Sequence, residues 1–140
     1  MEHSKLFKLF ICMALTACGS TAASGATTPQ PGEVKRTLLQ SQDLPDAPGM
    51  ESRLYLIEFP PSAASKPHTH STQAVGYVLE GRFESAFGDG PTVVKAAGEA
   101  FVDLPGLPHR FRNADSQKPL RFIIAGVFHK GEPLFQVIAP

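Results

Sequence analysis

The chain of 140 residues carries 13 basic and 13 acidic side chains, so its formal net charge at pH 7 is zero. This balance does not favour a nucleic-acid partner, whose binding needs a basic excess on one face, and the length suits one domain. The 13 prolines and 12 glycines are scattered between short apolar runs, which is typical of a turn-rich β protein rather than a helical bundle.

The first 17 residues are predicted to be a signal peptide. Lys5 and Lys8 precede an apolar segment at residues 9–17, which is too short to span a bilayer because a spanning helix needs about 20 residues. The segment runs into LTACG at residues 15–19, which resembles the lipobox of bacterial lipoproteins. The resemblance implies a lipidated Cys18, membrane anchorage and a periplasmic location, at the outer membrane because glycine follows the cysteine. An ordinary secretory signal with an incidental cysteine is the alternative.

The rest of the chain divides into a tether and one domain. Residues 18–32 are small and polar and contain proline and glycine, so they cannot bury enough apolar surface to fold and are expected to be a flexible tether. Residues 33–140 form the predicted domain. The other cysteine, Cys12, lies in the signal, so lipidation of Cys18 leaves the domain no thiol for a disulfide, a nucleophile or a metal site.

Short apolar runs separated by turn residues predict an all-β domain. No segment has the sustained apolar spacing of an amphipathic helix, whereas Phe83 and Phe87 lie in a run that alternates with the period of two of a half-buried strand. The sequence GDGP at residues 88–91 is a strong hairpin turn. Repeated short strands predict a sandwich or barrel. The expected strands are residues 34–39, 53–59, 75–79, 82–87, 92–95, 100–103, 109–112, 120–128 and 134–138.

The histidines are the candidate functional residues. His68 and His70 are separated by one residue, and residues i and i+2 of a strand point to the same face. Two imidazoles placed side by side in this way can share one metal ion. His109 lies far along the chain, and His129 is expected to be an exposed turn residue. Alone, a pair of this kind is a weak signal, because exposed histidines are common.

Two longer stretches make the signal specific. PHTHSTQAVGYVLEG, residues 67–81, resembles the first motif of the cupin superfamily, G-x5-H-x-H-x3,4-E-x6-G. GEAFVDLPGLPHRFRN, residues 98–113, resembles the second, G-x5-P-x-G-x2-H-x3-N. The resemblance covers residues 34–136 and implies an antiparallel jelly-roll barrel, the double-stranded β-helix. It also implies that His68, His70 and His109 are metal ligands inside the barrel.

The sequence departs from the cupin motifs at three positions. Ser62 replaces the first glycine, Leu104 the proline, and Ala74 the glutamate that supplies the fourth ligand. Alanine has no donor atom, so the prediction is a three-histidine centre with open positions. Gln73 is the alternative fourth ligand, if a bulge turns its amide inward. A divalent ion held by three neutral imidazoles keeps its full charge, which favours an anionic or chelating ligand.

The resemblance leaves two classes of function open. Three-histidine cupins include thiol and diketone dioxygenases, which implies a metal-dependent enzyme acting on a small chelating substrate. Iron(II) is the natural ion, and manganese, zinc, nickel and copper also suit imidazole. The other class is a non-enzymatic lipoprotein that binds or senses a metal or small molecule. A degenerate cupin without metal is a third alternative. Small cupins often pair, so the resemblance also implies a homodimer.

Other side chains are expected to have structural roles. Asp103 and Arg110 flank the second motif and could lie near the site, but charges at strand ends are more often solvated. Aromatic side chains at strand spacing are expected in the core or at the pocket mouth. These aromatic residues are Tyr77, Phe83, Phe101, Phe111 and Phe122.

Overall fold

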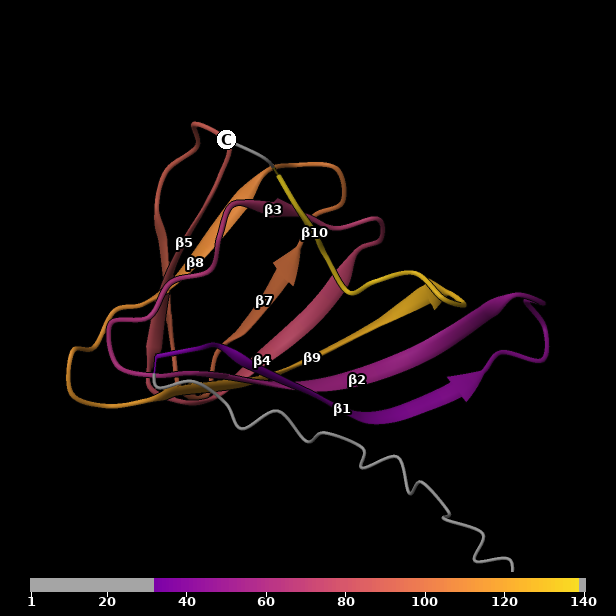
Figure 1. Ribbon diagram of the computed structural model, residues 1–140, viewed down its shortest axis with the longest axis horizontal. Helices are drawn as coiled ribbons and strands as arrows, with labels where there is room; N and C mark the ends of the chain where they lie inside the picture. The colour runs from indigo at the N-terminus through magenta and orange to yellow at the C-terminus, as the bar shows by residue number, and fades with distance from the viewer. Residues whose placement is uncertain (1–31, 139–140) are drawn as a thin grey trace, which may run out of the picture.

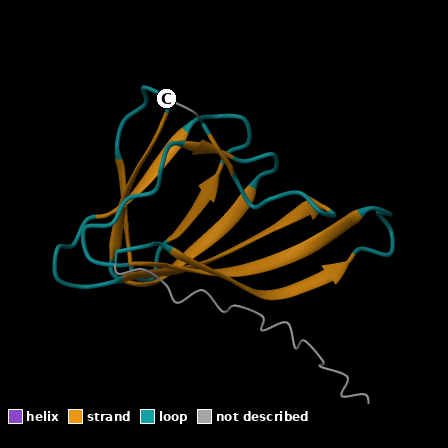
Figure 2. Cartoon of the chain, in the orientation of Figure 1, coloured by secondary structure: helices purple, strands orange, loops and turns teal. Residues whose placement is uncertain are grey.

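The computed structural model describes residues 32–138, and it confirms the all-β prediction. Figure 2 shows strands and loops, with no helix among the described residues. The strands are β1 (Lys35–Asp43), β2 (Met50–Phe59), β3 (His68–Thr69), β4 (Ala74–Glu80), β5 (Arg82–Phe87), β6 (Val93–Ala96), β7 (Ala100–Asp103), β8 (His109–Asn113), β9 (Leu120–His129) and β10 (Gln136–Val137).

The strands form two five-stranded sheets. The first has the order β1-β2-β9-β4-β7 and the second the order β10-β3-β8-β5-β6. Every pairing within them is antiparallel. In Figure 1, β1, β2, β9 and β4 cross the lower part of the view, and β3, β8 and β10 lie above them. From β2 to the end of the chain, successive strands alternate between the sheets, as in a jelly roll, except that the hairpin of β5 and β6 lies within one sheet.

The strand boundaries differ from the expected ones mainly at the first hairpin. β1 continues through residues 40–43, which looked like turn residues, because they pair with Glu51–Leu54 of β2. A bulge between Leu38 and Gln40 accommodates the longer ladder. The predicted hairpin at Gly88 is confirmed: β5 pairs with β6, and Gly90 N–H donates to the Phe87 carbonyl.

Aromatic side chains between the sheets form a large part of the core. The rings of Phe83 and Phe111 lie 4.6 Å apart, and the Phe111 ring stacks on Phe122 at 5.5 Å. Tyr77 is an exception, since 45% of its surface is exposed. The alternation of β4 turns Gly76 and Val78 inward, so the prediction for Tyr77 was wrong. The buried cluster comprises Ile57, Phe59, Ala74, Val78, Phe83, Phe111, Leu120, Phe122 and Ile124.

Two glycines allow close approaches that a side chain would block. Gly81 joins β4 to β5 with a φ of +77°, and a Cβ there would lie 2.5 Å from the Pro119 carbonyl oxygen. Gly76 faces Phe101 across the β4–β7 ladder, and a Cβ would lie 2.1 Å from the ring. Gly81, which ends the first motif, is therefore required by the backbone conformation at that position.

The predicted signal peptide, Cys18 and nearly all of the predicted tether lie outside the described residues. Within residues 32–138, no helix is long and apolar enough to cross a membrane.

Candidate metal centre

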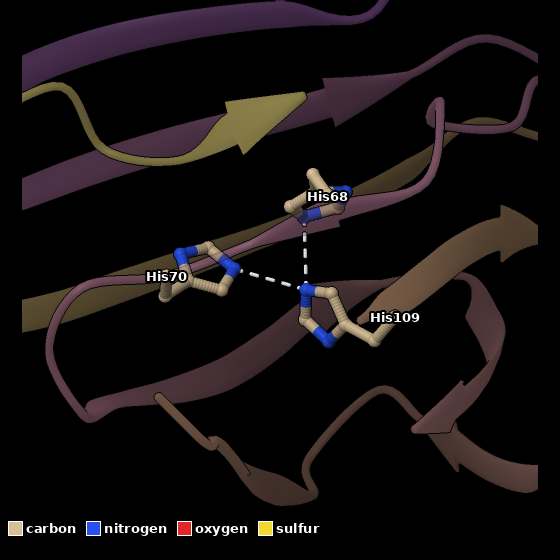
Figure 3. A group of neighbouring side chains, drawn as sticks. All are labelled: His68, His70 and His109. Carbon is tan, nitrogen blue, oxygen red and sulfur yellow. Dashed lines mark hydrogen bonds between the residues drawn. The ribbon is translucent and has the colours of Figure 1, made fainter. Parts of the chain in front are cut away.

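Three histidines from two neighbouring strands meet between the sheets. His68 begins β3, His70 follows its end, and His109 begins β8. His68 and His109 are direct partners in the β3–β8 ladder. All three are buried, with exposures of 6%, 5% and 2%. Figure 3 shows the His68 and His70 rings turned toward the same nitrogen of His109.

Backbone carbonyls fix two of the rings. Nδ1 of His68 lies 2.8 Å from the Lys66 carbonyl oxygen, and Nδ1 of His70 lies 2.8 Å from that of Leu134. A carbonyl only accepts a hydrogen bond, so this geometry assigns the proton to Nδ1 in both rings. Nε2 of each ring then carries a free lone pair that faces the centre of the cluster. This is the usual arrangement of a metal-binding histidine.

The three Nε2 atoms are close enough to bind a single ion. Nε2 of His109 lies 2.8 Å from that of His68 and 2.9 Å from that of His70. Two donors bound at right angles to one ion, each about 2.0–2.1 Å from it, lie about 2.9 Å apart. Without an ion, one proton on His109 must serve two facing lone pairs. The buried cluster could therefore hold a metal ion, which would satisfy all three nitrogens.

The surroundings keep the three imidazoles neutral. Burial is the main cause that lowers the pKa of His68 to about 4 and that of His109 to about 3. Burial also lowers the pKa of His70, although its bond to Leu134 opposes this. Neutral imidazole is the form that binds metal, so burial favours the protonation state that a metal centre would need at neutral pH.

Asp103 lies beside this centre, which is the alternative that the sequence left open for it, and it is not solvated as charges at strand ends usually are. Its exposure is 2%. One carboxyl oxygen lies 3.4 Å from Nε2 of His70, and the other lies 3.7 Å from Nδ1 of His109. Burial raises the pKa of Asp103 to about 7, while the pKa values of both histidines are lowered. These contacts are therefore not ion pairs at neutral pH.

Ala74, which replaces the glutamate of the first motif, lies on the inner face of its strand, as the sequence predicts. Ala74 is buried at 2% exposure, with its side chain on the inner face of β4. The preceding Gln73 is exposed, on the alternate face. We therefore do not include Gln73 among the groups that face the cluster.

An apolar cavity leads to the histidines. The volume of this cavity is about 30 Å³, which is enough for about two water molecules. Arg36 of β1 also lines the cavity, with its guanidinium 4.6 Å from the centre of the Phe135 ring. Partial burial lowers the pKa of Arg36, but the side chain stays charged at neutral pH. The apolar walls are Ile57, Phe59, Phe111, Phe122, Ile124, Leu134 and Phe135.

Comparison with known proteins identifies the family. Residues 55–126, about half of the chain, match the cupin domain family. The chain belongs to the cupin superfamily. This cupin brings together the histidines of both motifs, as the sequence resemblance implied. No curated protein sequence matches it significantly.

Solved structures share the cupin fold at low sequence identity. An uncharacterized protein with a double-stranded β-helix domain from Klebsiella pneumoniae is 22% identical, with a TM-score of 0.61 over 79% of this chain and 83% of that one. A cupin domain from Bordetella pertussis is 17% identical, with a TM-score of 0.55 over 72% and 98%. The DMSP lyase DddQ from Ruegeria pomeroyi is 17% identical, with a TM-score of 0.52 over 61% and 42%. At these identities the likeness concerns the fold alone.

The remaining residues of the cupin's second motif have structural positions. The amide of Asn113 donates to the carbonyls of Pro60 at 3.0 Å and Lys118 at 2.9 Å, while its oxygen accepts from Asp115 N–H. It therefore ties two loops together rather than facing the histidines. Arg110 and His129 are exposed, as expected. Sequence reasoning missed Arg36, whereas it named Asp103 as a residue that could lie near the site without assigning it a role.

Proposed function

We propose that this cupin is a metal-dependent enzyme that acts on a small chelating substrate at a centre formed by His68, His70 and His109. The observation that carries the proposal is the convergence of three buried, neutral imidazoles with their Nε2 atoms within reach of one ion. Three ligands leave coordination positions open, which is typical of catalytic rather than structural metal sites. The proposed ion is divalent, with iron(II) first and manganese, zinc, nickel or copper as alternatives.

The proposed reaction class is dioxygenation. A bound iron(II) would supply the redox chemistry and hold substrate and O₂ side by side. The chain's own contribution is to position the ion through the carbonyl-fixed rings of His68 and His70, and to surround it with apolar walls that exclude bulk water. The charged Arg36 on the cavity wall favours a substrate with an anionic group. The small volume favours a small substrate.

A non-enzymatic role is the second candidate. The cavity described above has room for only about two water molecules. That volume favours a protein that holds a metal ion or a very small ligand without converting a larger one. Under this alternative the same histidines bind the ion, so only turnover separates the two candidates.

The test begins with metal analysis of the purified full chain. Oxygen uptake is then measured on the iron(II)-loaded protein with a panel of diketones, flavonols and thiols. We expect uptake with a member of the panel, loss of uptake in His109→Ala, and no change in the matched control His129→Ala, whose histidine is exposed. Tight metal binding without turnover across the panel would favour the binding role. Failure to bind any divalent ion would refute both the metal-dependent enzyme and the metal-binding role.

We also propose that the protein is a homodimer. On the outer face of β4, Val75 and Tyr77 are 55% and 45% exposed, and Val102 of the neighbouring strand β7 is 42% exposed. A second copy packing sheet against sheet would cover this apolar face. Sedimentation velocity is the test: we expect a dimer for the native chain and a monomer for Val75→Lys/Tyr77→Lys. A monomeric native chain would refute the proposal.

A further inference from the structure

The carboxylate that is missing from the first motif has a counterpart on the adjacent strand. Ala74 of β4 and Asp103 of β7 are direct partners in the ladder between the two strands. Both are buried at 2% exposure. Partners in an antiparallel ladder place their side chains on the same face of the sheet, about 5 Å apart. Asp103 therefore projects into the interior beside the position from which a glutamate at residue 74 would project.

We propose that Asp103 is the fourth ligand of the metal centre, and that β7 supplies the carboxylate that β4 supplies in the cupin motif. This inference rests on the proposed metal site. It changes the predicted centre from three histidines to three histidines and one carboxylate.

The contacts of Asp103 support this role. Its Oδ2 atom is 3.4 Å from Nε2 of His70, the nitrogen that faces the centre of the cluster. Its Oδ1 atom is buried without a hydrogen-bond partner. The carboxyl group also borders the cavity that His68 and His70 line. The ligand atoms of the three histidines alone all lie within 4.8 Å of one another, so ligation requires the nearby Asp103 side chain to turn further toward the ion.

Burial without a countercharge points to the same conclusion. Removing a carboxylate from water is costly unless a cation or hydrogen bonds compensate for it. Among the described residues, the only basic side chains that approach Asp103 within 4 Å are His70 and His109. A divalent ion bound by the three Nε2 atoms would supply the missing positive charge.

The assignment alters the chemistry expected at the site. With three neutral imidazoles alone, a divalent ion keeps a charge of +2, whereas one carboxylate lowers the net charge of the centre to +1. The carboxylate also occupies one open position. An added oxygen donor improves the match to iron(II) and manganese(II) over ions that prefer nitrogen or sulfur.

A second role for Asp103 must be distinguished from ligation. Nδ1 of His109 has no hydrogen-bond partner and lies 3.7 Å from Oδ1 of Asp103. In many metal sites a carboxylate accepts a hydrogen bond from the distal nitrogen of a ligating histidine, and removing it costs about 10- to 100-fold in metal affinity. Direct ligation predicts a larger loss and a change in the donor set of the ion.

The experiment measures cobalt(II) binding to the full chain by chelator competition, together with the visible absorption of the bound ion, which reports its donor atoms. The variants are Asp103→Asn and Asp103→Ala, and the matched control is Glu84→Gln, which removes a half-buried carboxylate of β5 that pairs with Arg112. We expect Asp103→Asn to weaken affinity by about 100-fold or more and to shift the visible bands. Glu84→Gln should leave both unchanged.

A relocated carboxylate provides the reciprocal test. We expect Ala74→Glu to restore affinity when combined with Asp103→Ala, and to give no gain in the native background, where the position is already supplied. Circular dichroism and thermal unfolding in EDTA establish that each variant folds. If Asp103→Asn fails to fold, the relocated variant carries the test.

The outcomes separate this inference from the proposed function. Native protein that binds no cobalt(II), zinc or manganese refutes the metal site itself. Native protein that binds cobalt(II), with Asp103→Asn unchanged in affinity and spectrum, refutes ligation by Asp103 and leaves the three-histidine site standing. Weaker affinity with an unchanged spectrum also refutes ligation, because it assigns Asp103 to hydrogen bonding with His109.

Discussion

Backbone carbonyls, rather than contacts among the rings, orient two of the three imidazoles. Nδ1 of His68 bonds to a carbonyl two residues earlier in the chain, while Nδ1 of His70 bonds to Leu134, 64 residues later. These bonds do not depend on an ion. The candidate site is therefore preorganised, and binding an ion requires little rearrangement of the ligands.

The pKa values of the cluster predict how the stability of the metal-free domain depends on pH. Unfolded histidine titrates near 6.5, whereas the folded pKa is about 4 for His68, about 3 for His109 and also lowered for His70. Between pH 6.5 and about 4 the unfolded chain binds more protons at these sites, so the free energy of unfolding rises with pH. Three histidines therefore destabilise the folded state as the solution is acidified.

Asp103 acts in the opposite direction. Its pKa rises from 3.8 to about 7 on folding, so the folded state binds the extra proton in this window, and stability falls as pH rises. We expect the histidines to prevail, since three groups oppose one. Urea unfolding in EDTA should give a midpoint that rises from pH 4 to 6.5, with a steeper rise in Asp103→Asn. A urea midpoint that stays constant or falls between pH 4 and 6.5 would contradict the lowered pKa values of the three histidines.

Replacing Asn113 is expected to lower the stability of the domain without involving the candidate metal site. Its side chain is 1% exposed and bridges the loops before β3 and after β8 through Pro60, Lys118 and Asp115. We expect Asn113→Ala to lower the free energy of unfolding by about 2–4 kcal/mol, because it leaves buried carbonyls unpaired. Asn113→Asp should also destabilise, since a carboxylate cannot donate to those carbonyls. Urea unfolding measures both, and unchanged stability in either variant would refute the bridging role.

The histidines could be predicted from the sequence because their spacing carries the information, whereas Asp103 could not be placed by the same reasoning. Its role depends on the pairing of β4 with β7, which joins residues 29 positions apart. One signal was available: Phe101 was expected in the core, and residue i+2 of the same strand shares its face. Arg36 reaches the cavity only through the packing of β1, which no local pattern encodes.

At the level of strands, short elements hold the site and long elements build the core. β3 has two residues and β10 two, yet they pair with one another and bring His68 beside the C-terminal segment. β2 and β9 have ten residues each and pair along their whole length. Long strands were therefore predictable from apolar alternation. The pairing of β3 and β10 was not, because two residues carry no periodicity.

The close approach of β4 to β7 yields a prediction at this scale. A Cβ at Gly76 would lie 2.1 Å from the ring of Phe101, which is itself packed 4.9 Å from the ring of Phe83. We expect Gly76→Ala to lower the free energy of unfolding by about 1–3 kcal/mol through overpacking. In the background of Phe101→Leu the same change should cost less, since the smaller side chain leaves room. Additive effects in this double-mutant cycle, measured by urea unfolding, would show that the two residues do not couple.

At the level of the whole molecule, the domain contributes the candidate metal centre, and the N-terminal sequence contributes the proposed location. The site and the location have separate physical bases. Packing between the sheets positions the histidines, whereas the lipobox-like LTACG lies before the domain and is separated from it by a polar segment. All the contacts described above lie within residues 32–138. Function at the site and anchorage at Cys18 can therefore be tested independently.

Cys18 is the residue through which the whole molecule is expected to be anchored to the membrane. Diacylglycerol on this residue, with a further acyl chain on its amine, would anchor the chain stably, because more than one acyl chain is needed for lasting membrane binding. We expect the native chain, expressed in a Gram-negative host, to sediment with membranes and Cys18→Ala to become a soluble periplasmic protein. Cys12→Ala is the matched control, since this cysteine lies inside the predicted signal. Mass spectrometry of the mature N-terminus checks the lipid directly, and a Cys18→Ala protein that remains with the membranes would contradict the lipoprotein assignment.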